Sequence, residues 1–118
     1  MITIRLPVPP STNNLFANLP RGMGRFKTRE YCLWIKRADA RLTEQWRFIR
    51  PIERGKFSVE IRLPKIRGDC DNRIKAVMDL LVSRALTPDD RNCFKVSAEI
   101  DEELERECEV TVRPLVAG

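Results

Sequence analysis

The most regular stretch of the chain is Phe57–Leu63, whose sequence is FSVEIRL. Its apolar and polar side chains alternate, which is the pattern of a strand with one buried face. Pro64 ends this strand, and the apolar residues that follow recur at helical spacing, which predicts a helix over residues 72–85. Alternation resumes at residues 94–100. If strands 57–63 and 94–100 run parallel, the helix between them forms a right-handed βαβ crossover.

The flanking segments complete this unit. Alternating residues 2–6 and 109–113 predict two further strands, and an apolar stripe from Tyr31 to Ile49 predicts a second helix with Thr28 as its N-cap. Residues 11–27 are expected to form a long loop. The order β-α-β-α-β-β therefore predicts a single α+β domain over residues 1–118, with a mixed four-stranded sheet and two main helices on one face.

Composition limits the class of protein. The hydrophobic fraction of 42% and charged fraction of 33% are typical of a soluble globular protein. No apolar run approaches the ~20 residues of a membrane span, so we expect a cytoplasmic protein without a membrane partner. Histidine is absent, which excludes triads that depend on it, and no pair of cysteines has zinc-ligand spacing. The four cysteines are expected to be reduced packing residues.

The charge is unevenly distributed. Residues 1–91 contain 19 Lys and Arg against 10 Asp and Glu, whereas residues 92–118 contain 3 against 7. One interpretation is that these charges form ordinary solvated faces. The other is that the basic part binds phosphates of a nucleic acid and the acidic part faces elsewhere.

A group of closely spaced aspartates supports the second interpretation, because it could hold a metal ion next to a bound phosphate. The stretch GDCDNRIK at residues 68–75 contains Asp69, Asp71 and Lys75, and Asp89 and Asp90 follow the predicted helix. Crowded aspartates raise one another's pKa unless a cation neutralises them, and oxygen ligands suit Mg²⁺, with Mn²⁺ as an alternative. We expect Asp69, Asp71 and Asp90 to lie together and hold this metal. The competing interpretation is that these aspartates cap a helix and form a turn.

The basic residues around this cluster are candidates for DNA contacts. Lys75 is expected to hold the scissile phosphate or stabilise the charge that develops on it. The other candidates lie near the aspartates or in the loop at residues 11–27, and they are Arg67, Arg73, Arg21, Arg25 and Lys27. The roles of Asp79 and Asp89 stay open between metal binding and ion pairing or turn formation.

These residues resemble the RusA family of phage-derived Holliday junction resolvases. The resemblance rests on the DxDNxxK element at residues 69–75, the later Asp89–Asp90 pair and the PPSxN element at residues 9–13. It implies a RusA-like fold, catalytic roles for Asp69, Asp71, Asp90 and Lys75, and a nucleoid-associated homodimer. Such an enzyme nicks two strands of a four-way DNA junction symmetrically with Mg²⁺, in DNA recombination and repair. The chain departs from the family pattern at Gly68, where a basic residue is common, and at Asn92, where glutamine is usual.

Three other functions remain open from the sequence. The protein could bind junctions or forks without cleaving them, or it could be a metal-dependent nuclease that prefers forks or flaps. It could also be a small interaction protein whose acidic segment binds a basic partner.

Overall fold

The computed structural model describes residues 1–115 of the chain. Over that range the strands are β1 (Ile2–Pro7), β2 (Phe16–Asn18), β3 (Arg25–Lys27), β4 (Phe57–Leu63), β5 (Cys93–Ile100) and β6 (Glu107–Pro114). The helices are α1 (Arg29–Gln45) and α2 (Ile74–Ser83). Short 3₁₀ helices connect them, namely η1 (Thr12–Asn14), η2 (Pro20–Gly22), η3 (Trp46–Phe48), η4 (Cys70–Arg73) and η5 (Asp90–Asn92).

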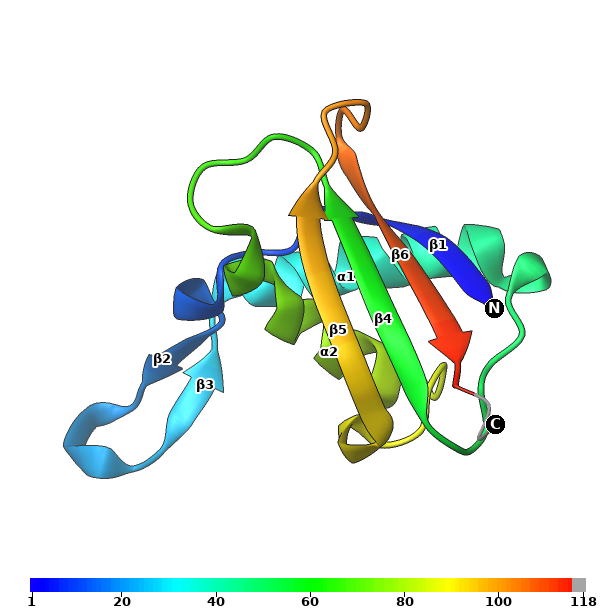
Figure 1. The fold of residues 1–118 in the computed structure, drawn as a ribbon. Coiled ribbons are helices and arrows are strands. Elements are labelled where there is room, and N and C mark those ends of the chain that lie inside the picture. The colour runs from blue at the N-terminus through cyan, green and yellow to red at the C-terminus, as the bar shows by residue number, and fades with distance from the viewer. Residues whose placement is uncertain (116–118) are drawn as a thin grey trace.

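The main sheet has four strands in the order β1-β6-β4-β5 (Figure 1). β6 pairs antiparallel with both β1 and β4, whereas β4 and β5 run parallel, with Phe57 opposite Cys93 and Leu63 opposite Ile100. The predicted α+β class, the mixed sheet and the βαβ unit around α2 are thus confirmed. β4 covers the predicted range 57–63, and β5 begins one residue before the predicted start.

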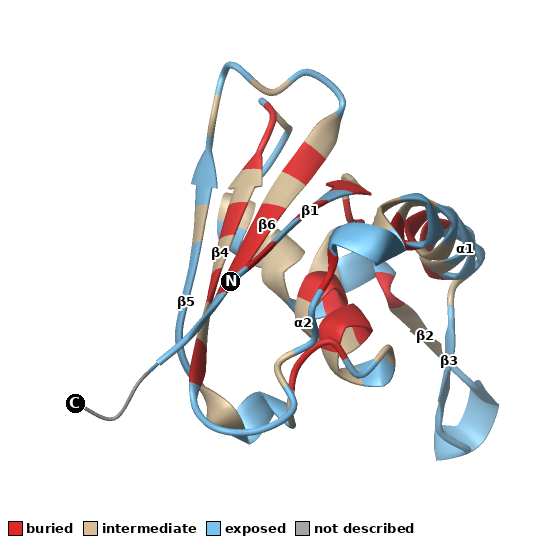
Figure 2. Ribbon diagram, turned by 90° about the vertical axis from the view of Figure 1, so that its right-hand side faces the viewer, coloured by how far each residue is buried: buried red, intermediate tan, exposed pale blue. Residues whose placement is uncertain are grey.

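Both helices pack on one face of the sheet and enclose the core (Figure 2). The alternation of β4 has the predicted consequence, because Phe57, Val59, Ile61 and Leu63 are all 0–1% exposed. They meet apolar side chains of α1 and α2, and each buried side chain of this size contributes about 1.5–3 kcal/mol. The other face of the sheet is polar and carries ion pairs such as that between Arg5 and Glu109.

Helix α1 begins as predicted and ends earlier than predicted. The Thr28 hydroxyl accepts a hydrogen bond from the Tyr31 amide, so Thr28 is the N-cap. The helix changes to 3₁₀ geometry at Trp46. Trp34 packs in the core, and its indole N–H donates to the Pro7 carbonyl at 2.9 Å. Trp46 belongs to the apolar stripe predicted from Tyr31 to Ile49, but it is 50% exposed because it lies beyond the last α-helical turn.

The expectation of a loop over residues 11–27 is wrong. Strands β2 and β3 form an antiparallel hairpin with η2 at its tip, and the hairpin extends away from the body of the protein (Figure 1). Gly22 and Gly24 both have positive φ, which the turn at the tip requires. A pair of short segments joined by a glycine-containing turn is a hairpin pattern, and it could have been recognised in the sequence.

Helix α2 begins at Ile74 rather than at Asn72, because Cys70–Arg73 form the 3₁₀ helix η4 ahead of it. Its buried residues are Ala76, Val77, Leu80 and Leu81. Val77 and Leu81 belong to the apolar stripe predicted for this helix, which also included Ile74, Met78, Val82 and Ala85. Of these, the first three are half-buried and Ala85 is exposed beyond the end of the helix. Within residues 1–115, neither length nor hydropathy qualifies any helix as a membrane span.

Candidate functional site

The first candidate element is the turn that follows β4. Gly68, with φ of 84°, helps the chain to reverse after the strand, and the segment then folds back beside β5. The Cys70 thiol lies 3.4 Å from the Ala98 carbonyl of β5 and fixes the position of η4 there. Asp69 is the N-cap residue of η4 and Asp71 lies within it, so both carboxylates lie on one short turn beside the outer strand of the sheet.

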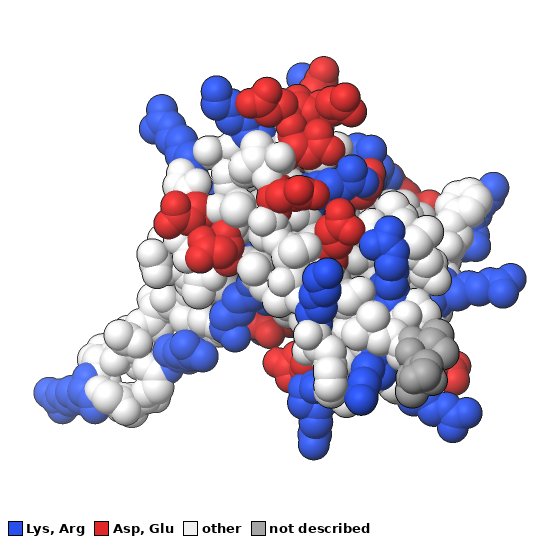
Figure 3. Space-filling view, viewed as in Figure 1, with Lys and Arg blue, Asp and Glu red and all other residues white. Residues whose placement is uncertain are grey.

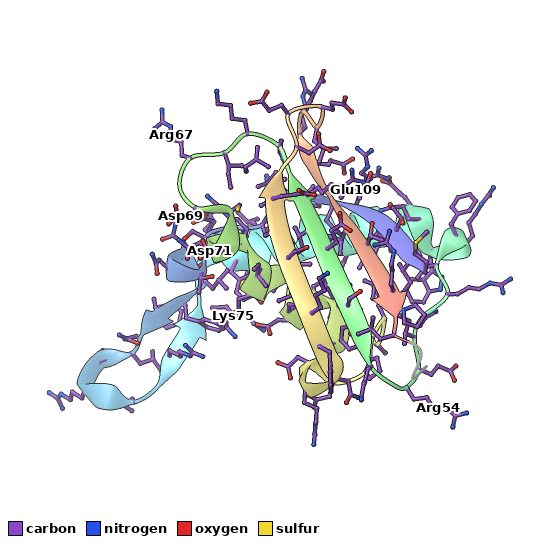
Figure 4. The ribbon with its side chains drawn as sticks, viewed as in Figure 1. Arg54, Arg67, Asp69, Asp71, Lys75 and Glu109 are labelled. Carbon is purple, nitrogen blue, oxygen red and sulfur yellow. The ribbon has the colours of Figure 1, made fainter. Side chains whose placement is uncertain are left out.

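Both carboxylates of this turn are exposed to solvent. Within residues 1–115, neither Asp69 nor Asp71 accepts a side-chain hydrogen bond or forms an ion pair, and the Asp69 side chain does not cap η4. Figure 4 shows Asp69, Asp71 and Lys75 in succession along the same edge of the molecule, beside the β2–β3 hairpin. The turn therefore presents two carboxylates whose oxygen atoms are available to a ligand.

The PPSxN element supports this turn from behind. The Thr12 hydroxyl donates to the Asn72 carbonyl at 2.8 Å, and Arg73 donates to the Pro9 carbonyl at 2.8 Å. A second guanidinium nitrogen of Arg73 donates to the Arg67 carbonyl at 3.2 Å. Arg73 is one of the residues expected to contact DNA, and in the structure it is half-buried with its guanidinium bonded to these two backbone carbonyls. It joins the N-terminal segment to the carboxylate turn.

Lys75 lies in the first turn of α2, and its amine is 3.4 Å from the Asp79 carboxylate. Both side chains are about half exposed, so the pair is worth little in stability, about 0–1 kcal/mol. A phosphate can therefore displace Asp79 from Lys75 at low cost.

Asp79 also lies near α1. The pKa of Tyr31 in α1 is raised mainly by burial and secondly by the charge of Asp79. A cavity of about 260 Å³ between the hairpin root, α1 and α2 is lined by Lys27 and Asp79 among others.

Asp90 does not join Asp69 and Asp71 in this structure. η4 lies beside Ala98, whereas Asp90 precedes Cys93 at the start of the same strand. The five residue steps from Cys93 to Ala98 span about 16 Å at the rise of a strand. Over residues 1–115, no three Asp, Glu, His or Cys side chains gather closely enough to hold a metal ion. The expected meeting of the three aspartates is therefore not found, and Asp69 and Asp71 remain as a pair.

The Asp89–Asp90 turn has its own electrostatics. The Arg91 amide donates to the Asp89 carboxylate at 3.0 Å, and this bond, with the hydrogen bond to Asp90 and the Arg91 side chain, lowers the pKa of Asp89 to about 2. The pKa of Asp90 is raised by its hydrogen bond to Asp89, by the Asp89 charge, by desolvation and by the Asp79 charge. The charge of Asp79 thus acts on Asp90 from the edge of α2 that also carries Lys75.

Lys and Arg side chains are spread over the face of the molecule in Figure 3, which also has one concentrated group of acidic side chains. Acidic side chains gather over the turn between β5 and β6, where Asp101, Glu102, Glu103 and Glu105 lie. Arg67 is exposed beside the carboxylate turn. The hairpin carries Arg21, Arg25 and Lys27, all exposed. Basic side chains therefore flank the Asp69–Asp71 turn, and the acidic turn is a separate surface.

No model of a known protein family matches the chain. No curated protein sequence matches it either. The likeness to RusA resolvases therefore depends on the motif residues themselves.

Proposed function

We propose that this protein is a RusA-like, structure-selective endonuclease that resolves four-way DNA junctions by paired symmetric nicks. The observation that carries the proposal is the pair of carboxylates, Asp69 and Asp71, which have no side-chain partner among the described residues and lie on an exposed turn flanked by basic side chains. Carboxylates without cationic partners repel one another, and a basic surface around them attracts phosphates. A divalent cation bound between the carboxylates and a DNA phosphate would offset the repulsion between these negative charges.

The donor set fits Mg²⁺, with Mn²⁺ as the alternative ion. Mg²⁺ is commonly held by one or two carboxylates together with waters and substrate phosphates, so Asp69 and Asp71 meet its minimum without a third protein ligand. When bound, the ion would polarise the phosphodiester and lower the pKa of a bound water. Asp90 does not fit the same position here, so its catalytic role in the proposal rests on the resemblance alone. It requires the 89–92 turn to approach η4 in the DNA-bound protein.

The side chains around the turn have separable roles. Lys75 is placed one helical turn from Asp71, where its amine can hold the scissile phosphate and stabilise the charge that develops on it. Arg67, Arg21, Arg25 and Lys27 are exposed and can bind phosphates of the DNA arms. Arg73 acts differently from these residues, because its hydrogen bonds position η4 against the N-terminal segment.

The proposal includes a homodimer in the cytoplasm, associated with the nucleoid. One chain with one carboxylate pair supplies one nick, whereas a four-way junction needs two nicks related by a twofold axis. Twofold dimers are the commonest soluble oligomers, and their axis matches that of the junction. Light scattering should therefore give the mass of two chains, and a mass of one chain at working concentration would contradict the dimer.

One observation favours a second function. Because Asp90 lies apart from Asp69 and Asp71, the protein could bind four-way junctions or forks without cleaving them, or cut branched DNA other than a four-way junction. Binding alone needs the basic surface and makes no use of a third carboxylate. This alternative and the resolvase share the same DNA surface and differ in turnover.

A single assay tests the proposal. Labelled four-way junction, fork and linear duplex are incubated with the protein with and without Mg²⁺, beside the variants Asp71→Asn and Glu102→Gln. Glu102 is the matched control, since it is an exposed carboxylate on the acidic turn. We expect Mg²⁺-dependent paired nicks in the junction from the wild type and Glu102→Gln only. Binding without nicks would favour the second function, and failure to bind any DNA would overturn both.

A further inference from the structure

The β2–β3 hairpin has a firmly held root. Leu15 is fully buried, and the Phe16 ring packs edge-on against Tyr31 of α1 at 5.7 Å between centroids. Thr28 closes the hairpin, since its amide donates to the Leu15 carbonyl at 3.0 Å and its hydroxyl donates to the Asn14 carbonyl at 2.6 Å. The hairpin is therefore attached to the helical layer at its base.

The tip of the hairpin carries apolar side chains that face water. Leu19, Met23 and Phe26 are 39%, 74% and 49% exposed, and none of them belongs to the core formed by the described residues. Bonds within the tip hold its shape, including one of 2.8 Å from the Leu19 amide to the Gly24 carbonyl. An exposed apolar group on a projecting element with a fixed shape is typical of a binding surface.

The hairpin has two distinct faces. Cross-strand partners share a face, so Phe16 with Lys27 and Asn18 with Arg25 lie on one side, and Ala17 with Phe26 lies on the other. The Arg25 guanidinium lies over the Phe16 ring at 4.1 Å.

The charge around the tip has a single sign. No acidic residue occurs between positions 11 and 29, a segment that contains four basic residues. In Figure 3 the hairpin projects from the molecule with mostly uncharged side chains and with Lys and Arg side chains among them. The apolar tip of the hairpin and its basic flanks are together suited to a ligand that has both flat apolar rings and phosphate groups.

We propose that this hairpin is a wedge that enters branched DNA at the point where strands exchange. Phe26 and Met23 insert at the unstacked base step, and Arg21 and Arg25 hold the neighbouring phosphates. Apolar side chains inserted between bases are a known way to hold deformed DNA, and stacking of a base on an aromatic ring is sequence-tolerant. An intact duplex offers no such step without the cost of unstacking, so the wedge selects branched DNA. The inference depends on the proposed function, because it assumes that branched DNA is the substrate.

The test separates selectivity from affinity. 2-Aminopurine is placed at the branch point of a four-way junction and, as the reference, inside a linear duplex, and both DNAs are titrated without divalent metal. We expect the wild type to increase the fluorescence of the junction probe. Met23→Ala combined with Phe26→Ala should abolish the increase and reduce the preference for junction over duplex about tenfold. Affinity for the duplex should stay unchanged in this variant.

Three further variants control the test. Leu33→Ala removes an apolar side chain of similar exposure, 43%, from α1 and should change neither readout. Phe26→Trp retains an aromatic ring and should retain the fluorescence increase. Arg25→Ala should weaken binding of junction and duplex alike, because it removes a phosphate contact.

The outcomes distinguish the wedge from the proposed function. If the protein prefers junctions but the probe does not respond, or if the response survives the double variant, the wedge is overturned and the junction enzyme stands. If the wild type binds no DNA, or shows no preference for branched DNA, both are overturned. Circular dichroism of each variant confirms that loss of signal does not come from loss of the fold.

Discussion

The two aspartate-containing turns at opposite ends of α2 differ although their sequences look alike. Each begins a 3₁₀ helix with an aspartate as N-cap and has a second aspartate inside it. In the later turn, Asp89 accepts a hydrogen bond from the Arg91 amide and also contacts the Arg91 side chain at 3.3 Å. In the earlier turn, the Asp69 side chain makes no capping bond.

The difference shows that local partners decide what an exposed carboxylate can do. Asp89 already accepts hydrogen bonds from the amide and the side chain of Arg91, and its hydrogen bond and charge raise the pKa of Asp90. Asp69 and Asp71 have carboxylates that no described side chain occupies, so a cation can bind them without breaking an existing contact. The earlier turn is therefore the centre of the proposed site, and the following experiments compare it with the later turn.

The largest effect is expected from Asp71→Asn. Cleavage of a four-way junction should fall by roughly 100-fold or more, because loss of one group that supports the transition-state charge costs about 3 kcal/mol. Junction binding should be unchanged or tighter, since a negative charge is removed from a DNA-binding surface. Single-turnover cleavage and gel-shift titration measure the two quantities. A wild-type cleavage rate in this variant would remove the earlier turn from the site.

Asp90→Asn tests whether the two turns act together. If Asp90 approaches η4 in the DNA complex, cleavage should fall by at least about tenfold, one decade being 1.36 kcal/mol of activation free energy. Mn²⁺ binding to the free protein should not change, because Asp90 lies apart from Asp69 and Asp71 without DNA. Paramagnetic broadening of amide signals by Mn²⁺ measures that binding. Unchanged cleavage would show that the later turn has no part in catalysis.

Variants of Lys75 and of the hairpin arginines should have separate effects, the first on catalysis and the second on DNA binding. Lys75→Ala should lower cleavage by roughly 10- to 100-fold through loss of a charged phosphate contact worth about 1.5–3 kcal/mol, with little change in junction affinity. Arg21→Ala and Arg25→Ala should mainly weaken binding, and each should reduce the slope of log K against log salt by ~0.9. Affinities measured from low to high salt give the slopes. If the DNA affinity of the wild type does not depend on salt concentration, the proposal of a nucleic-acid-binding surface is contradicted.

The smallest effect concerns proton binding in the later turn. The charge of Asp89 and its hydrogen bond raise the pKa of Asp90, so Asp89→Asn, which removes the charge, should lower the pKa of Asp90. The low pKa of Asp89, about 2, means that in the wild type Asp90 takes up a proton first as pH falls. Carboxyl ¹³C chemical shifts followed from neutral to acidic pH measure both groups. If Asp90 titrates identically in both proteins, Asp89 does not influence the pKa of Asp90.

Patterns within single elements could be predicted from the sequence. The alternation of Phe57–Leu63 fixed a strand whose bounds the structure confirms, and the stripe after it fixed a helix. When one face of a helix or strand is buried, apolar residues recur along it with the period of that element. The element can therefore be predicted without knowing what it packs against. The parallel pairing of β4 and β5 was considered from the sequence only as a condition for a βαβ crossover, and the structure meets that condition. A helix between two strands is the usual connection for parallel neighbours.

The position of Asp90 was decided by tertiary structure. In a parallel pair, the end of one strand and the start of the next lie at opposite edges of the sheet, and only the return of residues 64–69 brings η4 partway back along β5. How far such a segment returns depends on contacts between distant residues, such as Cys70 with Ala98 and Arg73 with Pro9. The residues that a metal site needs are thus evident in the sequence. Which of them meet is set by long-range packing, because contacts across the fold leave no periodic pattern along the chain.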